Sequence, residues 1–264
     1  MKKYFYVIPA FLAFLLILGI LYCVPILLSY TLIFFFGYER AYTLYMDHIT
    51  AVSMISYLIA LLPSAIWYHL AVGRKKGDHK KTHTLKPSHF GAVILLVFAL
   101  NHAISLLLSI LALLLPHATM AYDSLVENGG MTAYSLTWFL AVIVLAPLAE
   151  EMIFRGLICH YLKKTRMPFV AVNMIQAALF GCFHMNLIQG IYAFILGLFL
   201  GYLAYRYRTV KAAILAHAVF NLCGTVLTAL EAAFLSPSMQ TTIILLSLPL
   251  TYIMLNVIRD QTAD

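Results

Sequence analysis

The sequence predicts an all-α fold, a polytopic membrane helical bundle with about eight transmembrane helices. Three observations predict it: the composition, the spacing of the apolar segments and the placement of the basic residues. Hydrophobic residues make up 63% of the 264 residues and charged residues 10%, whereas a soluble domain carries about 25% charged residues. A chain of this length fits one helical bundle in a membrane.

Eight apolar segments follow one another, each near the roughly 20 residues that cross a bilayer as a helix. Because lipid offers the backbone no hydrogen bonds, each segment is expected to be helical. The segments cover residues 5–28, 49–71, 90–115, 135–158, 168–186, 188–205, 212–234 and 240–258. Within one integrated membrane domain, three spans and an outer loop occupy residues 1–130, a core occupies 131–234, and the last span with a short tail occupies 235–264.

The basic residues predict the orientation of the bundle. With eight spans, the basic connections at 74–86, 163–166 and 206–211 all lie on one side of the membrane. Short cytoplasmic loops are enriched in lysine and arginine, so this side and both termini are expected to be cytoplasmic. The net charge of +7 is then explained by contact with anionic lipid, and no nucleic acid partner is expected.

Three polar motifs interrupt the apolar segments of the second half. Glu150 and Glu151 follow the charge-free run at 136–149, and Arg155 comes four residues after Glu151. Carboxylates at membrane depth are costly, so such a cluster is by default a candidate functional site. The second motif is FGCFH, which ends at His184, and the third is HAVFN, from His217 to Asn221.

The spacing within the motifs gives the two neighbouring glutamates different roles. Glu151 and Arg155 share a helix face and can form an ion pair. Glu150 is rotated by about 100° from Glu151 and avoids this pair. One carboxylate can therefore be held by arginine while its neighbour stays available for proton transfer. His217 and Asn221 are also four residues apart and can point into one cavity.

Together these side chains fit the hydrolysis of an amide by activated water. Glu150, near His184, could take a proton from water as a general base. His217 and Asn221 could donate hydrogen bonds to an oxyanion. Each motif alone also fits a structural role, because buried ion pairs and histidines commonly connect membrane helices. The occurrence of all three motifs in order favours the functional interpretation.

The segments EEMIFR, FGCFH and HAVFN resemble the EExxxR, FxxxH and HxxxN or HxxxD pattern of the CAAX prenyl endopeptidase family. Its bacterial relatives are called the CPBP or Abi family of intramembrane proteases. The resemblance covers about residues 135–225 and includes Gly197 and Gly201, which allow close helix packing. It implies Glu150 as the catalytic glutamate, His184 as its assistant, His217 and Asn221 as oxyanion donors, and Glu151 and Arg155 as supports of the local architecture.

The resemblance leaves two alternatives for a cofactor. The family was long described as metalloproteases and later as glutamate-dependent enzymes without a metal. Glu150, His184 and His217 could ligate zinc, but no HExxH segment supports a zincin helix. We therefore expect no cofactor, with zinc as the alternative.

The expected partners are membrane lipid and a peptide or protein substrate that reaches the bilayer, prenylated or lipidated peptides included. The expected location is the plasma membrane of a bacterium, and the oligomeric state is left open. Asn186 and Gln189, just past His184, are weaker candidates for substrate contact.

Two other function classes compete with an endopeptidase. Related bacterial proteins are associated with bacteriocin immunity and with scaffolding of sensor kinases, which predicts a non-enzymatic membrane protein. The second competitor is a transporter that relays protons through its carboxylates. No pair of symmetry-related broken segments supports the transporter.

The expected depths of the motif residues in the membrane differ, so they can form one site only if the helices depart from simple straight spans. At ~1.5 Å per residue from the cytoplasmic ends of the expected spans, Glu150 lies ~15 Å deep, His217 ~9 Å and His184 ~24 Å. The three converge only if part of 156–172 lies along the interface, or if a helix is tilted or broken around a water-filled cavity.

Overall fold

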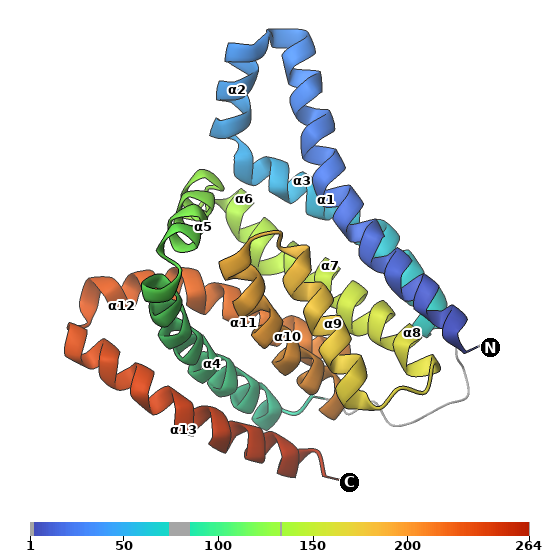
Figure 1. The fold of residues 1–264 in the computed structure, drawn as a ribbon, viewed down its shortest axis with the longest axis vertical. Helices are drawn as coiled ribbons and strands as arrows, with labels where there is room; N and C mark the ends of the chain where they lie inside the picture. The colour runs from blue at the N-terminus through green and yellow to red at the C-terminus, as the bar shows by residue number, and fades with distance from the viewer. Residues whose placement is uncertain (1–2, 74–84, 133, 264) are drawn as a thin grey trace. The chain divides into compact units, whose positions relative to one another are not determined.

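The computed structural model describes residues 3–73, 85–132 and 134–263, which form helices joined by short turns, with no strand among them (Figure 1). The predicted all-α membrane bundle is confirmed. By length and composition, seven helical segments of the described residues can cross a membrane. These are Tyr4–Phe36, Ile49–Gly73, Pro87–Leu114, Leu136–Lys164, Leu187–Arg206, Val210–Phe234 and Pro237–Gln261.

Helix α9 (Phe169–Phe183) lies where an eighth full span was expected at 168–186. It has 15 residues, so it is about 22 Å long, against ~30 Å for the hydrocarbon core of a bilayer. Pro168 precedes its first residue, and beyond its end Met185 has a left-handed φ of 51°. Left-handed backbone cannot continue a right-handed helix. This turn shortens the segment relative to the apolar run from which it was predicted.

The chain forms two compact units. The first comprises residues 1–75 and 123–172, and the second comprises residues 76–122 and 173–264. Helix α5 (Pro116–Asn128) contains one boundary. Of the basic connection discussed above, residues 74–84 lie outside the described part of the chain.

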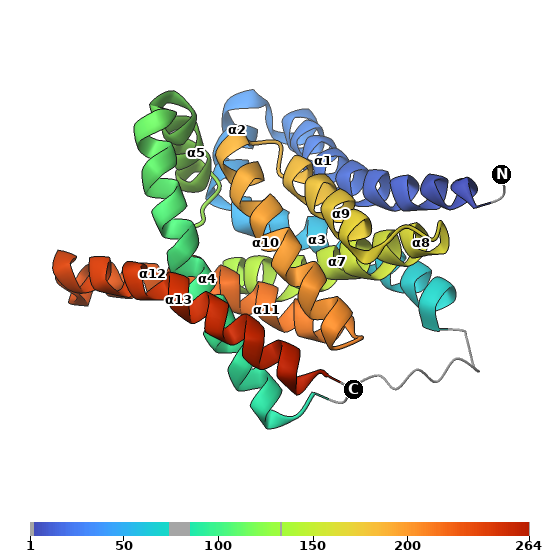
Figure 2. The same ribbon diagram turned by 60° about the horizontal axis from the view of Figure 1, so that its bottom comes forward.

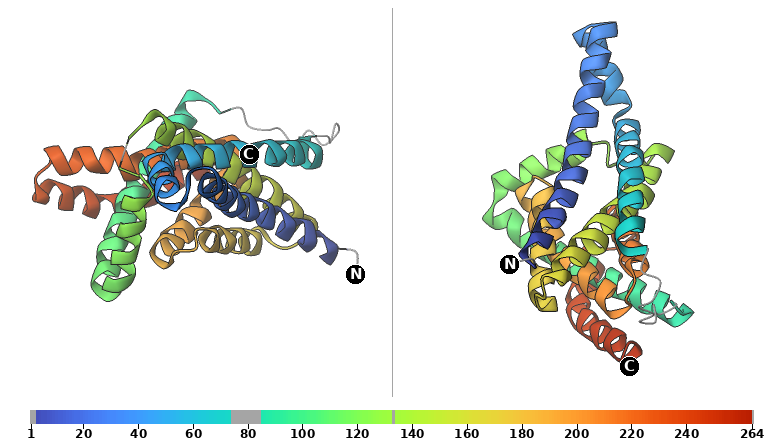
Figure 3. Two further views of the ribbon diagram at one scale, coloured as in Figure 1. Left: turned by 90° about the horizontal axis from the view of Figure 1, so that it is seen from above. Right: turned by 90° about the vertical axis from the view of Figure 1, so that its right-hand side faces the viewer.

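In the first unit, α1 (Val7–Phe36) packs beside α3 (Ile49–Tyr68), as the right-hand view of Figure 3 shows. Helix α2 (Tyr38–Asp47) joins them after Gly37, whose φ of 75° ends α1. Small side chains let membrane helices approach closely, and α3 also contacts the helix that carries the two glutamates. The buried face of α3 has small residues at four-residue spacing: Ser56, Ala60 and Ser64.

The two glutamates lie in a helical segment whose hydrogen-bond register changes on both sides of them. Pro147, in the first turn of α7, has no N–H to donate, and the helix is widened just before it. The chain stays helical through Lys164 and turns only at 165–168. The segment comprises α6 (Leu136–Trp138), a π-helical stretch at Phe139–Leu145, α7 (Ala146–Glu151), a second π-helical stretch at Met152–Ile158, and α8 (Cys159–Lys164).

A glycine permits close packing at the second π-helical stretch. A Cβ on Gly156 would lie 2.6 Å from the ring of Tyr68, at the end of α3. Real side-chain contacts are essentially never that short, so with a larger residue the ring of Tyr68 or its helix would have to shift. Gly156 thereby keeps α3 near the segment that follows the glutamates.

In the second unit, α4 (Pro87–Leu114) and α13 (Pro237–Gln261) run side by side (Figures 1 and 2). Helix α11 (Val210–Leu222) packs against both α4 and α10 (Leu187–Arg206). A π-helical stretch, Cys223–Leu227, continues α11 into α12 (Thr228–Phe234).

Helices α9 and α10 approach closely because glycines line their contact. A Cβ on Gly197 would lie 3.1 Å from Ala177, and a Cβ on Gly201 would overlap the side chain of Asn173. The amide of Asn173 donates in turn to the carbonyl oxygen of Leu198 at 3.0 Å. The close packing expected at Gly197 and Gly201 is therefore present.

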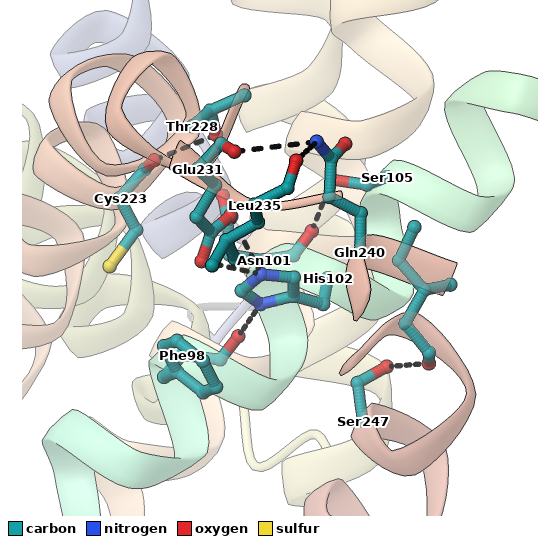
Figure 4. A network of polar contacts seen from close by, with 11 residues as sticks. Phe98, Asn101, His102, Ser105, Cys223, Thr228, Glu231, Leu235, Gln240 and Ser247 are labelled. Carbon is teal, nitrogen blue, oxygen red and sulfur yellow. Dashed lines mark hydrogen bonds and ion pairs between the residues drawn. The ribbon is translucent and has the colours of Figure 1, made fainter. Parts of the chain in front are cut away.

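A polar network connects α4, α12 and α13 in the second unit (Figure 4). Nε2 of His102 lies 3.2 and 3.1 Å from the two carboxylate oxygens of Glu231, and Nδ1 lies 2.8 Å from the carbonyl oxygen of Phe98. Because a carbonyl only accepts, Nδ1 carries a hydrogen. Gln240 donates to the backbone carbonyls of Glu231 and Leu235. His102 therefore serves as an interhelical hydrogen-bonding group, the role expected by default for a polar residue in a span.

Replacing His102 with leucine is expected to lower the free energy of unfolding by about 1–2 kcal/mol, because Glu231 then loses its partner in a largely buried pair. Glu231→Gln retains a hydrogen-bonding side chain and is expected to cost less. Thermal unfolding of the purified variants in lipid nanodiscs measures both effects. Unfolding of His102→Leu at the wild-type temperature would contradict a stabilising role for the pair.

Candidate active site

Both glutamates of the first motif are buried in α7. Glu150 is 3% exposed and Glu151 is not exposed at all. Arg155 donates from Nη1 to Oε1 of Glu151 at 2.6 Å, and neither side chain reaches solvent. The ion pair expected from the four-residue spacing is therefore present. Charge-assisted hydrogen bonds of this length are strong, so the pair anchors the start of the second π-helical stretch.

Glu150 is engaged by a residue that the motifs do not contain. The hydroxyl of Tyr57, on α3, donates to Oε1 of Glu150 at 2.6 Å. The two residues are 93 positions apart in the sequence, and Tyr57 lies in an apolar span without any motif. Sequence reasoning missed this contact because it arises from the packing of α3 on α7.

His184 lies in the turn after α9, one residue beyond the end of the helix. Its Nδ1 is 2.8 Å from the carbonyl oxygen of Phe180. The carbonyl can only accept, so Nδ1 carries the hydrogen, and in a neutral ring Nε2 holds the lone pair. The turn thus favours the tautomer with its hydrogen on Nδ1, which leaves Nε2 able to accept a proton.

His217 lies inside α11 and is 4% exposed. The ring of Phe180 makes edge-on contacts with both histidines, with centroids 5.0 Å from His184 and 5.7 Å from His217. Phe180 is itself buried. The phenylalanine of FGCFH therefore holds the second and third motifs together, a role that the spacing alone did not reveal. Asn221 follows His217 by one helical turn and is half-buried.

Asn186 and Gln189, the weaker candidates for substrate contact, lie at the start of α10. The side-chain oxygen of Asn186 accepts a hydrogen bond from the backbone N–H of Gln189 at 3.0 Å. Asn186 thereby caps the N-terminus of α10. This cap, together with the left-handed Met185, shapes the turn that carries His184.

The motif residues divide between the units. Glu150, Glu151 and Arg155 belong to the first unit, and His184, His217 and Asn221 belong to the second. Among the described residues, no group of three or more His, Cys, Asp or Glu side chains is arranged so that it could hold a metal ion.

These side chains and the fold define a polytopic helical integral membrane protein with a glutamate, histidine and asparagine set. Residues 132–223 match the family described as Type II CAAX prenyl endopeptidase Rce1-like, and this segment contains all three motifs. This match supports the resemblance to the CAAX protease family that the motifs indicated. No curated protein and no solved structure matches the chain. The family match supports a CAAX-type intramembrane endopeptidase in general terms.

Proposed function

We propose that the protein hydrolyses peptide bonds of membrane-associated substrates with a water molecule activated by Glu150. The observation that carries the proposal is the family match over 132–223, which includes every residue of the three motifs. The burial of Glu150 beside the separate Glu151–Arg155 pair supports it. Glu151 is paired with Arg155, and Glu150 accepts a hydrogen bond from the neutral hydroxyl of Tyr57.

In the proposed reaction, Glu150 accepts a proton from water while the oxygen of that water attacks the scissile carbonyl. His184 assists at this step, and its lone pair on Nε2 suits it to accept a proton. The proton then passes to the leaving amine as the C–N bond breaks. This sequence consumes one water and needs no nucleophilic serine or cysteine.

His217 and Asn221 are proposed to stabilise the tetrahedral intermediate. A ring N–H of His217 and the side-chain amide of Asn221 can donate to the oxyanion, and their spacing of one helical turn puts both on one face of α11. The packing of Phe180 against His217 supports a fixed ring orientation. Donors held in place before the reaction lower the barrier most, because they need not reorganise when charge develops.

A metal is not required by this proposal. The chain contains no HExxH segment, which zincins use to place two histidines on one helix. If zinc does bind, Glu150, His184 and His217 would hold it, and it would polarise the carbonyl and the water. Hydrolysis that continues after dialysis against a chelator supports the version without a metal.

The substrates are proposed to be peptides or proteins that reach the bilayer, with prenylated or otherwise lipidated peptides as the first class to test. A lipid chain partitions into the membrane with about 0.8 kcal/mol for each buried CH₂, so it concentrates its peptide near an intramembrane site. The plasma membrane of a bacterium is the proposed location.

The test compares membranes that contain wild-type protein with membranes that contain Glu150→Gln at matched expression. N- and C-terminal mass spectrometry of membrane peptides is expected to find fragments that are absent in the variant. Glu39→Gln is the matched control, because it makes the same chemical change at an exposed residue of the first unit. Its fragments should equal those of the wild type.

If the two profiles are identical and Glu150→Gln still rescues the phenotype of a deletion strain, proteolysis by Glu150 is excluded. That outcome would favour the non-enzymatic alternative, an immunity factor or a scaffold for a sensor kinase.

A further inference from the structure

Three membrane-spanning segments of the first unit meet at one corner of that unit. They are Tyr4–Phe36, which begins there, and Ile49–Gly73 and Leu136–Lys164, which end there. Helix α8, the last part of Leu136–Lys164, contacts both α1 and the 3₁₀ turn at Tyr4–Tyr6 (Figure 1). Near the end of α3, Trp67 donates from Nε1 to the hydroxyl of Tyr161 on α8 at 2.9 Å. The corner therefore joins parts of the chain that are far apart in the sequence.

The length of Leu136–Lys164 places this corner at the depth of the lipid headgroups. The segment has 29 residues, which give about 40 Å of helix at ~1.5 Å per residue. The hydrocarbon core of a bilayer is ~30 Å thick, and the headgroup layers bring it to ~40–45 Å. The last residues of the segment therefore reach the headgroups, where tyrosine and tryptophan are also enriched.

Four basic side chains lie at the corner, three at the end of α8 and one at the start of the chain. The turn after α8 brings the exposed residues Lys163 and Arg166 close together, because the N–H of Arg166 bonds to the carbonyl oxygen of Lys163 at 3.0 Å. Lys164 lies between them. Lys3, also exposed, begins the 3₁₀ turn that contacts α8. Positive charge from two distant segments thus gathers at headgroup depth.

The described carboxylates of the first unit lie in other places. They are Glu39 and Asp47 on α2, beyond the far end of α1, Asp123 and Glu127 on α5, before the start of Leu136–Lys164, and Glu150 and Glu151 on α7. Glu151 is paired with Arg155. The unit therefore separates its charges, with the cations at the corner and the carboxylates along or beyond the spans.

Two tyrosine rings hold the ammonium group of Lys164. Its Nζ lies 5.1 Å from the ring centre of Tyr6 and 5.0 Å from that of Tyr161. A cation within about 6 Å of a ring centre is attracted by the face of the ring. The two rings thus fix the position of one positive charge before a ligand binds, which reduces the entropy that binding loses.

The hydroxyl of Tyr161 offers a hydrogen-bond donor beside this charge. Its oxygen accepts from Trp67, and a hydroxyl has one hydrogen of its own to donate. Among the described residues, the bond from Trp67 is the one hydrogen bond of this hydroxyl. Its hydrogen is therefore left for a ligand that carries acceptor oxygens.

We propose that this corner binds the headgroup of an anionic phospholipid, whose phosphate meets the ammonium of Lys164 and the hydroxyl of Tyr161. Ionised phosphate oxygens accept hydrogen bonds, and both side chains donate them. A zwitterionic headgroup would bring its own ammonium against Lys3, Lys163 and Arg166, so these cations select a lipid with net negative charge. Basic pockets at the cytoplasmic ends of membrane helices suit such headgroups. The proposal does not depend on the proposed hydrolysis.

Fluorescence of Trp67 reports on the corner directly, because its ring centre lies 6.2 Å from that of Tyr161. The chain has two tryptophans, so Trp138→Phe leaves Trp67 as the sole emitter. The full-length variant is reconstituted into vesicles that contain brominated phosphatidylglycerol and phosphatidylcholine in varied ratio, and quenching gives the relative affinity for the two lipids. We expect a preference of more than about tenfold for phosphatidylglycerol, which has net negative charge. Equal affinity overturns the proposal.

The double variant Lys163→Gln with Arg166→Gln tests the cations at exposed positions. It is expected to lower the preference by about tenfold or more, because each basic residue near an anionic surface contributes about fivefold. An unchanged preference overturns the proposal. If Trp138→Phe does not fold, native mass spectrometry of the protein with both tryptophans counts retained phosphatidylglycerol in the same variants, and the double variant should retain less.

Arg208→Gln with Lys211→Gln is the matched control. It removes the same two residue types from exposed positions in the second unit. Arg208 has a left-handed φ of 52°, as Arg166 has one of 68°, so both pairs change an arginine in the same backbone region. The control should keep the wild-type preference. An equal loss in both double variants would show a general attraction to charge and overturn the proposal.

Tyr161→Phe tests the donor separately, since it keeps the ring beside Lys164 and removes the hydroxyl. The preference is expected to fall by about tenfold, the effect of one hydrogen bond to a charged group. A wild-type preference in this variant overturns the role of the hydroxyl in the site.

Inorganic phosphate, added at constant ionic strength, distinguishes a lipid from a soluble phosphate compound. The preference for phosphatidylglycerol is expected to remain, because the site lies among the headgroups. Its loss at millimolar phosphate would show that the corner binds a soluble phosphate and would overturn the assignment to a lipid.

Discussion

Replacing Arg155 with methionine is expected to leave little folded protein in the membrane. Arg155 and Glu151 form an ion pair at 2.6 Å in which neither side chain is exposed. Removing one partner of a buried pair leaves an uncompensated charge and costs about 3–5 kcal/mol. The whole free energy of unfolding of a domain is about 5–15 kcal/mol, so this loss is large. The yield of monodisperse protein and its thermal unfolding in nanodiscs measure it.

The double variant Glu151→Leu with Arg155→Met distinguishes the cost of an unpaired buried charge from the cost of altered side-chain packing. It removes both charges at once, and replacement of a whole buried pair by apolar side chains is often neutral. We expect it to recover most of the stability that Arg155→Met loses. Arg259→Met is the control, because Arg259 pairs with Asp260 at the surface, where both side chains are mostly exposed, and such pairs contribute little. Normal folding of Arg155→Met would show that the pair does not support α7.

The second large effect is expected on hydrolysis. Asn221→Ala should lower kcat by about 10²–10³, the loss found when one oxyanion donor is removed. The hydroxyl of Thr225 bonds to the backbone carbonyl of Asn221, so this contact does not depend on the amide. The rate on a farnesylated CAAX-type reporter peptide and the thermal unfolding of the same sample are measured together.

Two further variants complete this test. The family pattern accepts either HxxxN or HxxxD, so Asn221→Asp is expected to retain more activity than Asn221→Ala. Asn256→Ala is the matched control, since the amide of Asn256 on α13 bonds within its own helix turn, to the carbonyl of Tyr252. A wild-type kcat in Asn221→Ala would remove Asn221 from the proposed oxyanion stabilisation.

Contacts within a single helical turn were predictable from the sequence. The pair of Glu151 and Arg155 follows from four-residue spacing on a helix and is present at 2.6 Å. Helical structure followed from the apolar segments, because a backbone in lipid has to satisfy its hydrogen bonds internally. The close approach at Gly197 and Gly201 was also expected, since only small residues allow it.

Changes of helical register and helix length were not predictable in the same way. The π-helical stretches on both sides of α7 differ from an α-helix only in the hydrogen-bond partner, and their apolar composition carries no signal of this. Helix α9 ends at Phe183, before the turn at His184, although the apolar segment was expected to extend to residue 186. Hydropathy reports affinity for the membrane and does not mark where the backbone turns.

By itself, the sequence determined that this chain is a helical membrane protein with a charged pair and two histidine motifs. The helical period determines which side chains share one helix face. A helix is the expected structure in lipid because it satisfies the backbone hydrogen bonds within the segment. Only the tertiary structure decided that Tyr57 bonds to Glu150, that Phe180 contacts both histidines, and that His102 meets Glu231. Each of these contacts joins different helices or turns, and the packing of whole helix faces selects such partners.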